Sequence, residues 1–95
     1  MQSAVERLVQ LGPFPSSSSA TVPALQEVEA LLAKVQTPIT DDEARALVRL
    51  FGPDDCFGLA WSLLHLVETS PSWPIEDALE DLRGEWIERL RERSA

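Results

Sequence analysis

The chain has 95 residues, of which 44% are hydrophobic, and it carries a formal net charge of −8. A chain of this length forms one domain with one small core, and an enclosed substrate cavity would compete with that core for the same side chains. The negative charge repels nucleic acid phosphates and anionic lipid, so we expect neither nucleic acid nor a membrane as a partner.

The N-terminal residues predict one short helix followed by a loop. Apolar residues at helical spacing give a helix over residues 3–11 one buried face, and Gly12–Pro13 ends it. Residues 13–21 contain four consecutive serines, which have high backbone entropy and gain little from burial. We therefore expect a mobile loop, or an arm that orders on a partner with Phe14 as its anchor.

The next two helices have clear start signals. Thr21 is the expected cap of a helix over residues 22–36. The segment from Thr40 to Glu43 has the spacing of a capping box, in which each side chain accepts a hydrogen bond from the backbone N–H of the other residue. This box predicts a third helix that begins after Thr40 and stops at Gly52–Pro53.

The fourth predicted helix, residues 54–69, is the most apolar part of the chain. Its centre, residues 56–67, is hydrophobic nearly all round when wound as an α-helix, which is typical of a buried central helix. After a turn at residues 70–74, apolar residues repeat at helical spacing and predict a fifth helix over residues 74–93. Carboxylates crowd the first turns of this helix and arginines its last, which suits the helix dipole.

These elements predict an all-α protein. No segment alternates polar and apolar residues with β-branched enrichment, and no hairpin signal occurs. Short connections marked by proline or glycine favour antiparallel packing. We expect a single helical domain over residues 1–95, a compact antiparallel bundle around the buried helix at 54–69. The bundle has five helices, or six if the loop at 13–21 hides a short turn.

The sequence points to no catalytic, cofactor or metal site. Cys56 and His65 are nine residues apart on one predicted helix, which separates them by about 13 Å on nearly opposite faces. They cannot form a nucleophile–base pair, and one Cys with one His cannot build a structural zinc site. The acidic pairs do not match the calcium-loop pattern. We therefore expect a protein that is not an enzyme and binds no cofactor.

Negative charge is concentrated in the middle of the chain. Residues 36–82 contain ten carboxylates and two arginines, so this segment alone has a net charge of −8. Opposite charge speeds association, and we expect this segment to bind a basic protein. Trp73 lies between Ser72 and Pro74, and flanking proline would hold it rigid. It is expected either to plug the core or to anchor the partner. The expected partner-binding residues are Asp41, Asp42, Glu43, Asp54, Asp55, Trp73, Glu76, Asp77, Glu80 and Asp81.

Three functions are compatible with these features. The first is a small acidic immunity or antitoxin-like protein that blocks a basic toxin in a bacterium, since seven arginines to one lysine fit a GC-rich genome. The second is a helical adaptor. In size and helix number the chain resembles the death-fold modules, and this resemblance implies recruitment of effectors by homotypic contacts. The basic side of such a contact would be formed by Arg83, Arg89, Arg91 and Arg93. The third function is that of a small-ligand protein or enzyme.

The sequence also carries signals about location. The first residues lack the basic segment of a secretory signal, and no apolar run approaches the roughly 18 residues that span a bilayer. A lone cysteine requires no oxidising compartment. We therefore expect a cytoplasmic protein.

Overall fold

The computed structural model describes residues 1–94, which form helices and loops and contain no β-strand. The prediction of an all-α fold is confirmed. No helix in this part of the chain is long and apolar enough to cross a bilayer. The helices are α1 (Ser3–Leu11), α2 (Val22–Lys34), α3 (Asp41–Leu47) with a following 3-10 turn (Val48–Leu50), α4 (Leu59–Val67), α5 (Glu76–Leu79) and α6 (Glu85–Ser94).

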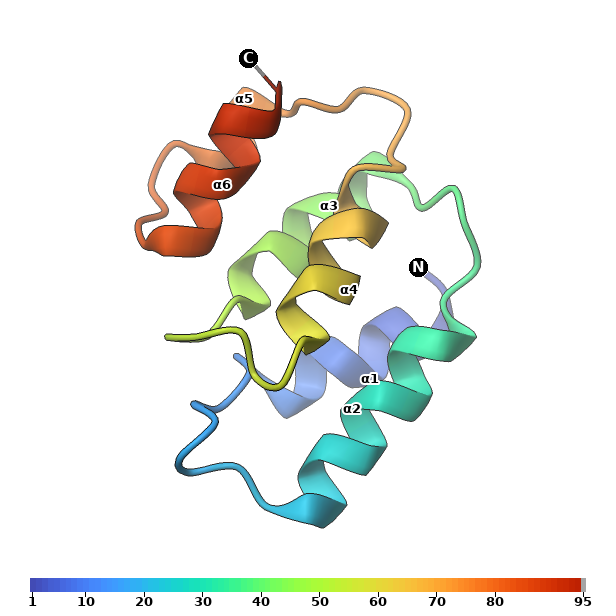
Figure 1. The fold of residues 1–95 in the computed structure, drawn as a ribbon. Coiled ribbons are helices and arrows are strands. Elements are labelled where there is room, and N and C mark those ends of the chain that lie inside the picture. Colours follow the sequence, from blue (N-terminus) through green and yellow to red (C-terminus); the bar gives the residue numbers. More distant parts are fainter. Residues whose placement is uncertain (95) are drawn as a thin grey trace.

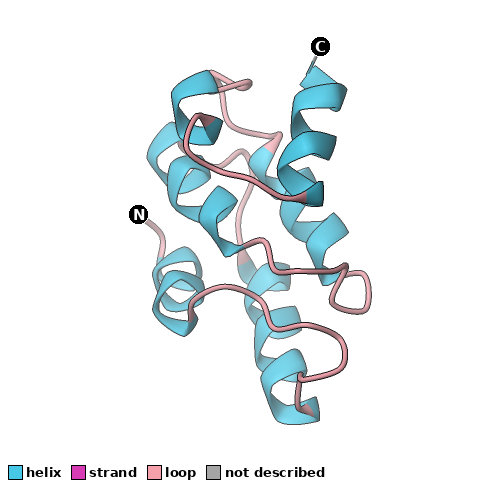
Figure 2. Ribbon diagram, turned by 90° about the vertical axis from the view of Figure 1, so that its left-hand side faces the viewer, coloured by secondary structure: helices cyan, strands magenta, loops and turns pink. Residues whose placement is uncertain are grey.

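The main helices are arranged in two layers (Figures 1 and 2). One layer contains α2, α4 and α6, with α4 in the middle, and α1 and α3 lie behind it. α4 contacts α2, α3 and α6, and α1 contacts α2 and α3. One side of α4 faces solvent, because Trp61, Ser62 and His65 are exposed.

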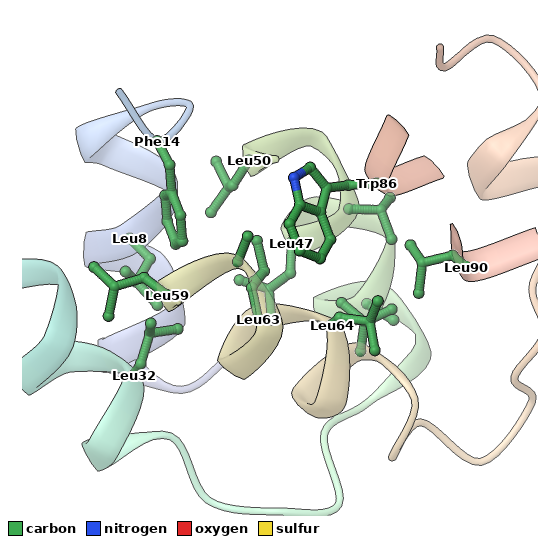
Figure 3. Close-up of a cluster of buried hydrophobic side chains, with 14 of the residues drawn as sticks. Leu8, Phe14, Leu32, Leu47, Leu50, Leu59, Leu63, Leu64, Trp86 and Leu90 are labelled. Carbon is green, nitrogen blue, oxygen red and sulfur yellow. The ribbon is translucent and has the colours of Figure 1, made fainter. Parts of the chain in front are cut away.

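The hydrophobic core fills the space between the layers (Figure 3). Leu63 and Leu64 of α4 lie at its centre, and both are fully buried. Their neighbours come from every part of the chain, so that loops as well as helices contribute to one cluster. The labelled neighbours are Leu8, Phe14, Leu32, Leu47, Leu50, Leu59, Trp86 and Leu90.

Both predicted helix caps are present. The Thr21 hydroxyl accepts a hydrogen bond from the backbone N–H of Ala24 at 3.3 Å. The Thr40 hydroxyl accepts from the N–H of Glu43 at 3.1 Å, and the Glu43 carboxylate accepts from the N–H of Thr40 at 2.9 Å. This pair of bonds completes the capping box, which satisfies two backbone donors that have no partner within the helix.

The fourth helix is shorter than predicted. α4 begins at Leu59 and not near residue 54, because Cys56, Phe57 and Gly58 have left-handed backbone angles, with φ of 47°, 56° and 88°. The N–H groups of Gly58 and Ala60 both donate to the carbonyl of Asp55. The residues before α4 therefore form a left-handed turn. Hydrophobic spacing did not reveal it, because apolar residues continue at helical intervals through the turn.

The predicted continuous helix over residues 74–93 is wrong, because the structure divides it into α5 and α6. Gly84 between them has φ of 119°, a conformation that side-chain-bearing residues rarely adopt. The Arg83 guanidinium also donates to the carbonyls of Glu80 and Leu82, which supports the non-helical backbone there. This break, and not the loop at 13–21, accounts for the sixth helix within the described residues.

The loop at 13–21 is attached to the helices at two points. Phe14 is only 3% exposed, and its backbone N–H donates to the carbonyl of Leu50 at 2.8 Å. The N–H and hydroxyl of Ser17 donate to the Asp54 carboxylate. Phe14 therefore belongs to the chain's own core and does not serve as an exposed anchor, whereas the mobility of the loop stays a prediction.

Candidate functional site

Five of the predicted acidic residues meet between the first turn of α3 and α5, namely Asp41, Asp42, Glu76, Asp77 and Glu80. Arg45 connects the two segments, because its guanidinium lies 3.5 Å from the Asp42 carboxylate and 3.4 Å from that of Asp77. The surface between them is an open hollow of about 690 Å³, which we call the acidic hollow. It is lined by Arg45, Ser72, Pro74, Ile75, Glu76, Asp77 and Glu80.

Asp41 fixes one edge of the acidic hollow. Its carboxylate accepts a hydrogen bond from the backbone N–H of Ser72 at 3.1 Å, which ties the loop after α4 to the start of α3. Hydrogen bonds from the side chain and backbone of Ser72 hold the pKa of Asp41 below its ordinary value. The position at a helix N-terminus suits the same negative charge.

The acidic hollow carries excess negative charge, since Glu76, Asp77 and Glu80 line it with a single guanidinium, that of Arg45. Asp42 pairs with the same guanidinium, and Asp41 bonds to Ser72 at the edge. The side chains of Asp42 and Asp77 are 87% and 67% exposed, so their ion pairs with Arg45 are accessible to solvent. Exposed ion pairs contribute only about 0–1 kcal/mol, and another cation can therefore replace Arg45 at little cost. Groups that fit this site are guanidinium and ammonium groups, which donate hydrogen bonds to carboxylates.

The remaining predicted carboxylates lie outside the acidic hollow. Asp54 and Asp55 precede α4, at the opposite end of that helix from Ser72. The Asp54 carboxylate accepts from the N–H groups of Ser17 and Cys56, and these bonds lower its pKa. Asp54 thus stabilises the local turn, whereas Asp55 and Asp81 are exposed.

Glu43 is not a surface residue, and we remove it from the expected partner-binding set. It is 3% exposed, and its carboxylate accepts from the backbone N–H of Gln2 at 3.0 Å as well as from Thr40. Burial raises the pKa of Glu43, but the hydrogen bonds from Thr40 and Gln2 outweigh burial and leave this pKa below its ordinary value. Glu43 therefore joins the N-terminal residues to α3.

We expect Glu43→Gln to lower the free energy of unfolding by about 1–3 kcal/mol at neutral pH. The two carboxylate oxygens accept from two separate backbone N–H groups, whereas the NH2 group of an amide only donates and leaves one N–H without its acceptor. The pKa of Glu43 is lower in the folded state than in the unfolded state. The carboxylate therefore contributes fully to the free energy of unfolding above its unfolded pKa. This contribution is lost as the pH falls through its folded pKa. Urea unfolding should show a difference between wild type and variant at about pH 7 that shrinks toward about pH 3. An equal difference at both pH values would contradict this role.

Trp73 packs against the core and does not line the acidic hollow. It is partly buried, and its indole Nε1 is enclosed without a hydrogen-bond partner in the structure. This position corresponds to the expected core plug. Its neighbours Ser72 and Pro74, rather than the indole ring, face the hollow.

The arginine-rich end is paired with carboxylates of the same chain. Arg89 lies 2.7 Å from Glu85, Arg91 lies 2.6 Å from Glu88, and Arg93 lies 2.8 Å from Glu68. Arg83 donates to backbone carbonyls. These contacts reduce the positive charge that this end could offer to the acidic middle of a second copy.

Sequence reasoning missed two exposed aromatic side chains, because it treated residues 56–67 as a helix that is hydrophobic nearly all round and therefore buried. Phe57 is 65% exposed and precedes α4 in the left-handed turn, and Trp61 is 39% exposed on α4 itself. The Trp61 ring packs edge-on against Trp86, with ring centroids 5.0 Å apart. Hydrophobic spacing gave no signal for this exposure, because the turn changes the direction in which Phe57 points relative to a continuous helix.

Comparisons with protein-family models, with curated proteins and with solved structures found no significant match. Among residues 1–94, no group of three or more His, Cys, Asp or Glu side chains is arranged to hold a metal ion.

Proposed function

We propose that this chain is a non-enzymatic protein-binding protein of the immunity or antitoxin type, and that its acidic hollow binds a basic partner. The observation that supports this most is the meeting of carboxylates from α3 and α5 around a single arginine. The composition further supports a bacterial, cytoplasmic protein.

Binding would proceed by exchange of cations in the acidic hollow. A guanidinium or ammonium group of the partner would replace Arg45 at Asp42 and Asp77 and keep those carboxylates paired. Because the chain as a whole is acidic, long-range attraction would raise the association rate of a basic partner. Salt would lower this rate. The homotypic adaptor has less support, because three of the four arginines that it requires are paired with carboxylates of their own chain and Arg83 donates to backbone carbonyls.

The double variant Asp77→Asn/Glu80→Gln should weaken binding of a fluorescein-labelled oligo-arginine peptide about tenfold at low salt. It removes one carboxylate of an exposed ion pair and one further exposed carboxylate of the hollow. The matched control, Glu6→Gln/Glu27→Gln, removes the same formal charge on α1 and α2, and Glu27 likewise belongs to an exposed ion pair with Arg7.

Fluorescence anisotropy titrations of the three proteins measure this difference. We expect the control to lose no more than about twofold, since it changes only the overall field. Equal losses in both variants would show that the peptide senses net charge alone, and the acidic hollow would then have no role as a site.

A further inference from the structure

α4 lies between α2 and α6 (Figure 1), and its outer side carries exposed or half-buried side chains. These side chains, namely Trp61, Ser62, His65 and Leu66, together with the exposed Phe57 in the turn before α4, define what we call the α4 face. Beside it runs a groove of about 250 Å³ between α2 and α4. This groove is lined by Glu29, Leu32, Ala33, Leu59, Ser62 and Leu66.

Phe57 has a strained backbone conformation that costs folding energy. Its φ of 56° lies in the left-handed region, where asparagine and glycine are tolerated but a bulky side chain is rare. Its ring is 65% exposed, so little burial compensates for this strain. Strained residues that expose an aromatic ring are typical of positions that contact another molecule.

Trp61 is fixed in place, unlike a free surface side chain. Its ring lies against Trp86, and the Arg89 guanidinium carbon sits 5.2 Å from its centroid. Arg89 is held in turn by Glu85 at 2.7 Å. A ring that is already immobilised loses little entropy when a partner covers it, which favours binding.

Acidic residues border the α4 face. Glu29 lines the groove, and Asp55 precedes Phe57 by two residues. Within the part of the chain that the structure describes, neither carboxylate forms a hydrogen bond or an ion pair. Among residues 1–94, the α4 face therefore has two carboxylates beside it without a paired cation, while Arg89 at Trp61 is already paired with Glu85.

We propose that the α4 face binds an amphipathic helix of a partner protein whose polar edge carries Lys or Arg. Apolar side chains on one side of that helix would contact Phe57, Trp61 and the groove, in the manner of helix-in-groove recognition. Its basic side chains would meet Glu29 and Asp55. A second copy of this chain is disfavoured as the occupant, because each copy carries a charge of −8. The acidic hollow lies between α3 and α5, so this proposal does not depend on it.

The test uses two fluorescein-labelled peptides of leucine and lysine with the same composition. In one, the leucines recur at helical spacing and form a single face; in the other, they are scrambled. We expect anisotropy titrations to give about tenfold tighter binding of the helical peptide. Because the two peptides have equal charge, their affinity ratio reports on the apolar surface and not on the net field.

Phe57→Asn should reduce this ratio to about one while leaving the protein as stable as wild type or more stable, since asparagine tolerates the left-handed conformation. Val22→Asn is the matched control, because Val22 is 64% exposed at the start of α2 and lies outside the α4 face. It should leave the ratio unchanged. Asp77→Asn/Glu80→Gln should also leave the ratio unchanged, which separates this surface from the acidic hollow.

Three results would overturn the proposal. Equal affinity for both peptides would mean that only charge is recognised. An affinity ratio between the helical and scrambled peptides that is unchanged in Phe57→Asn would mean that the apolar contact lies elsewhere on the protein. Light scattering that detects a dimer of wild type, but not of Phe57→Asn, would make a second copy the occupant.

Discussion

Leu64→Ala should lower the free energy of unfolding by about 2–5 kcal/mol, and Leu63→Ala should do the same. Both side chains are completely buried at the junction of the two layers (Figure 3). Truncation removes apolar contacts and leaves a cavity that the surrounding helices fill only in part. A domain of this size has about 5–15 kcal/mol of stability in total, so either variant should lose a large fraction of it.

Urea unfolding followed by far-UV circular dichroism measures this loss. Leu11→Ala is the matched control, because Leu11 is 39% exposed at the end of α1 and should cost less than about 1 kcal/mol. Losses below about 1 kcal/mol at both Leu63 and Leu64 would contradict the central position of α4 in the core.

Gly52→Ala should lower the free energy of unfolding by about 2–3 kcal/mol. A Cβ atom at this position would collide with the backbone carbonyl oxygen of Phe14. The loop at 13–21 would have to move away, which would weaken the 2.8 Å bond from the Phe14 N–H to the Leu50 carbonyl. The Phe14 ring would then lose its place in the core.

Limited proteolysis reports on the same movement. We expect Gly52→Ala to speed cleavage within the loop at 13–21, because attachment of the loop depends on Phe14. Ser18→Ala, an exposed change in the loop itself, should leave both stability and cleavage as in wild type. A Gly52→Ala protein with wild-type stability and cleavage would mean that the loop does not pack against Gly52.

Local signals in the sequence were sufficient for much of the fold. The helix starts at Thr21 and Thr40 were predicted because a side chain caps the backbone within three residues. The division of the last helix at Gly84 and the turn at Cys56–Gly58 were not predicted. Both depend on backbone angles that hydrophobic spacing does not encode, and the apolar residues on either side remain in helical register.

The candidate site was predictable only in part. Composition located the negative charge, but contacts such as that between Arg45 and Asp77 join residues 32 positions apart. Such contacts depend on how the whole chain packs. The sequence therefore could not show that Asp77 lies in the acidic hollow while Asp54 lies outside it. Glu43 was predicted both to complete the capping box and to bind a partner. The structure has it in the capping box, where it is buried and cannot contact a partner.

The most direct test of the acidic hollow is a ¹⁵N–¹H correlation spectrum of the labelled protein during titration with the oligo-arginine peptide. We expect the largest shift changes at the backbone amides of Asp42, Arg45, Asp77 and Glu80, because a partner cation would replace Arg45 there. Changes spread evenly over exposed carboxylates such as Glu6 and Glu27, with none larger at the hollow, would contradict the proposal that this surface binds a basic partner.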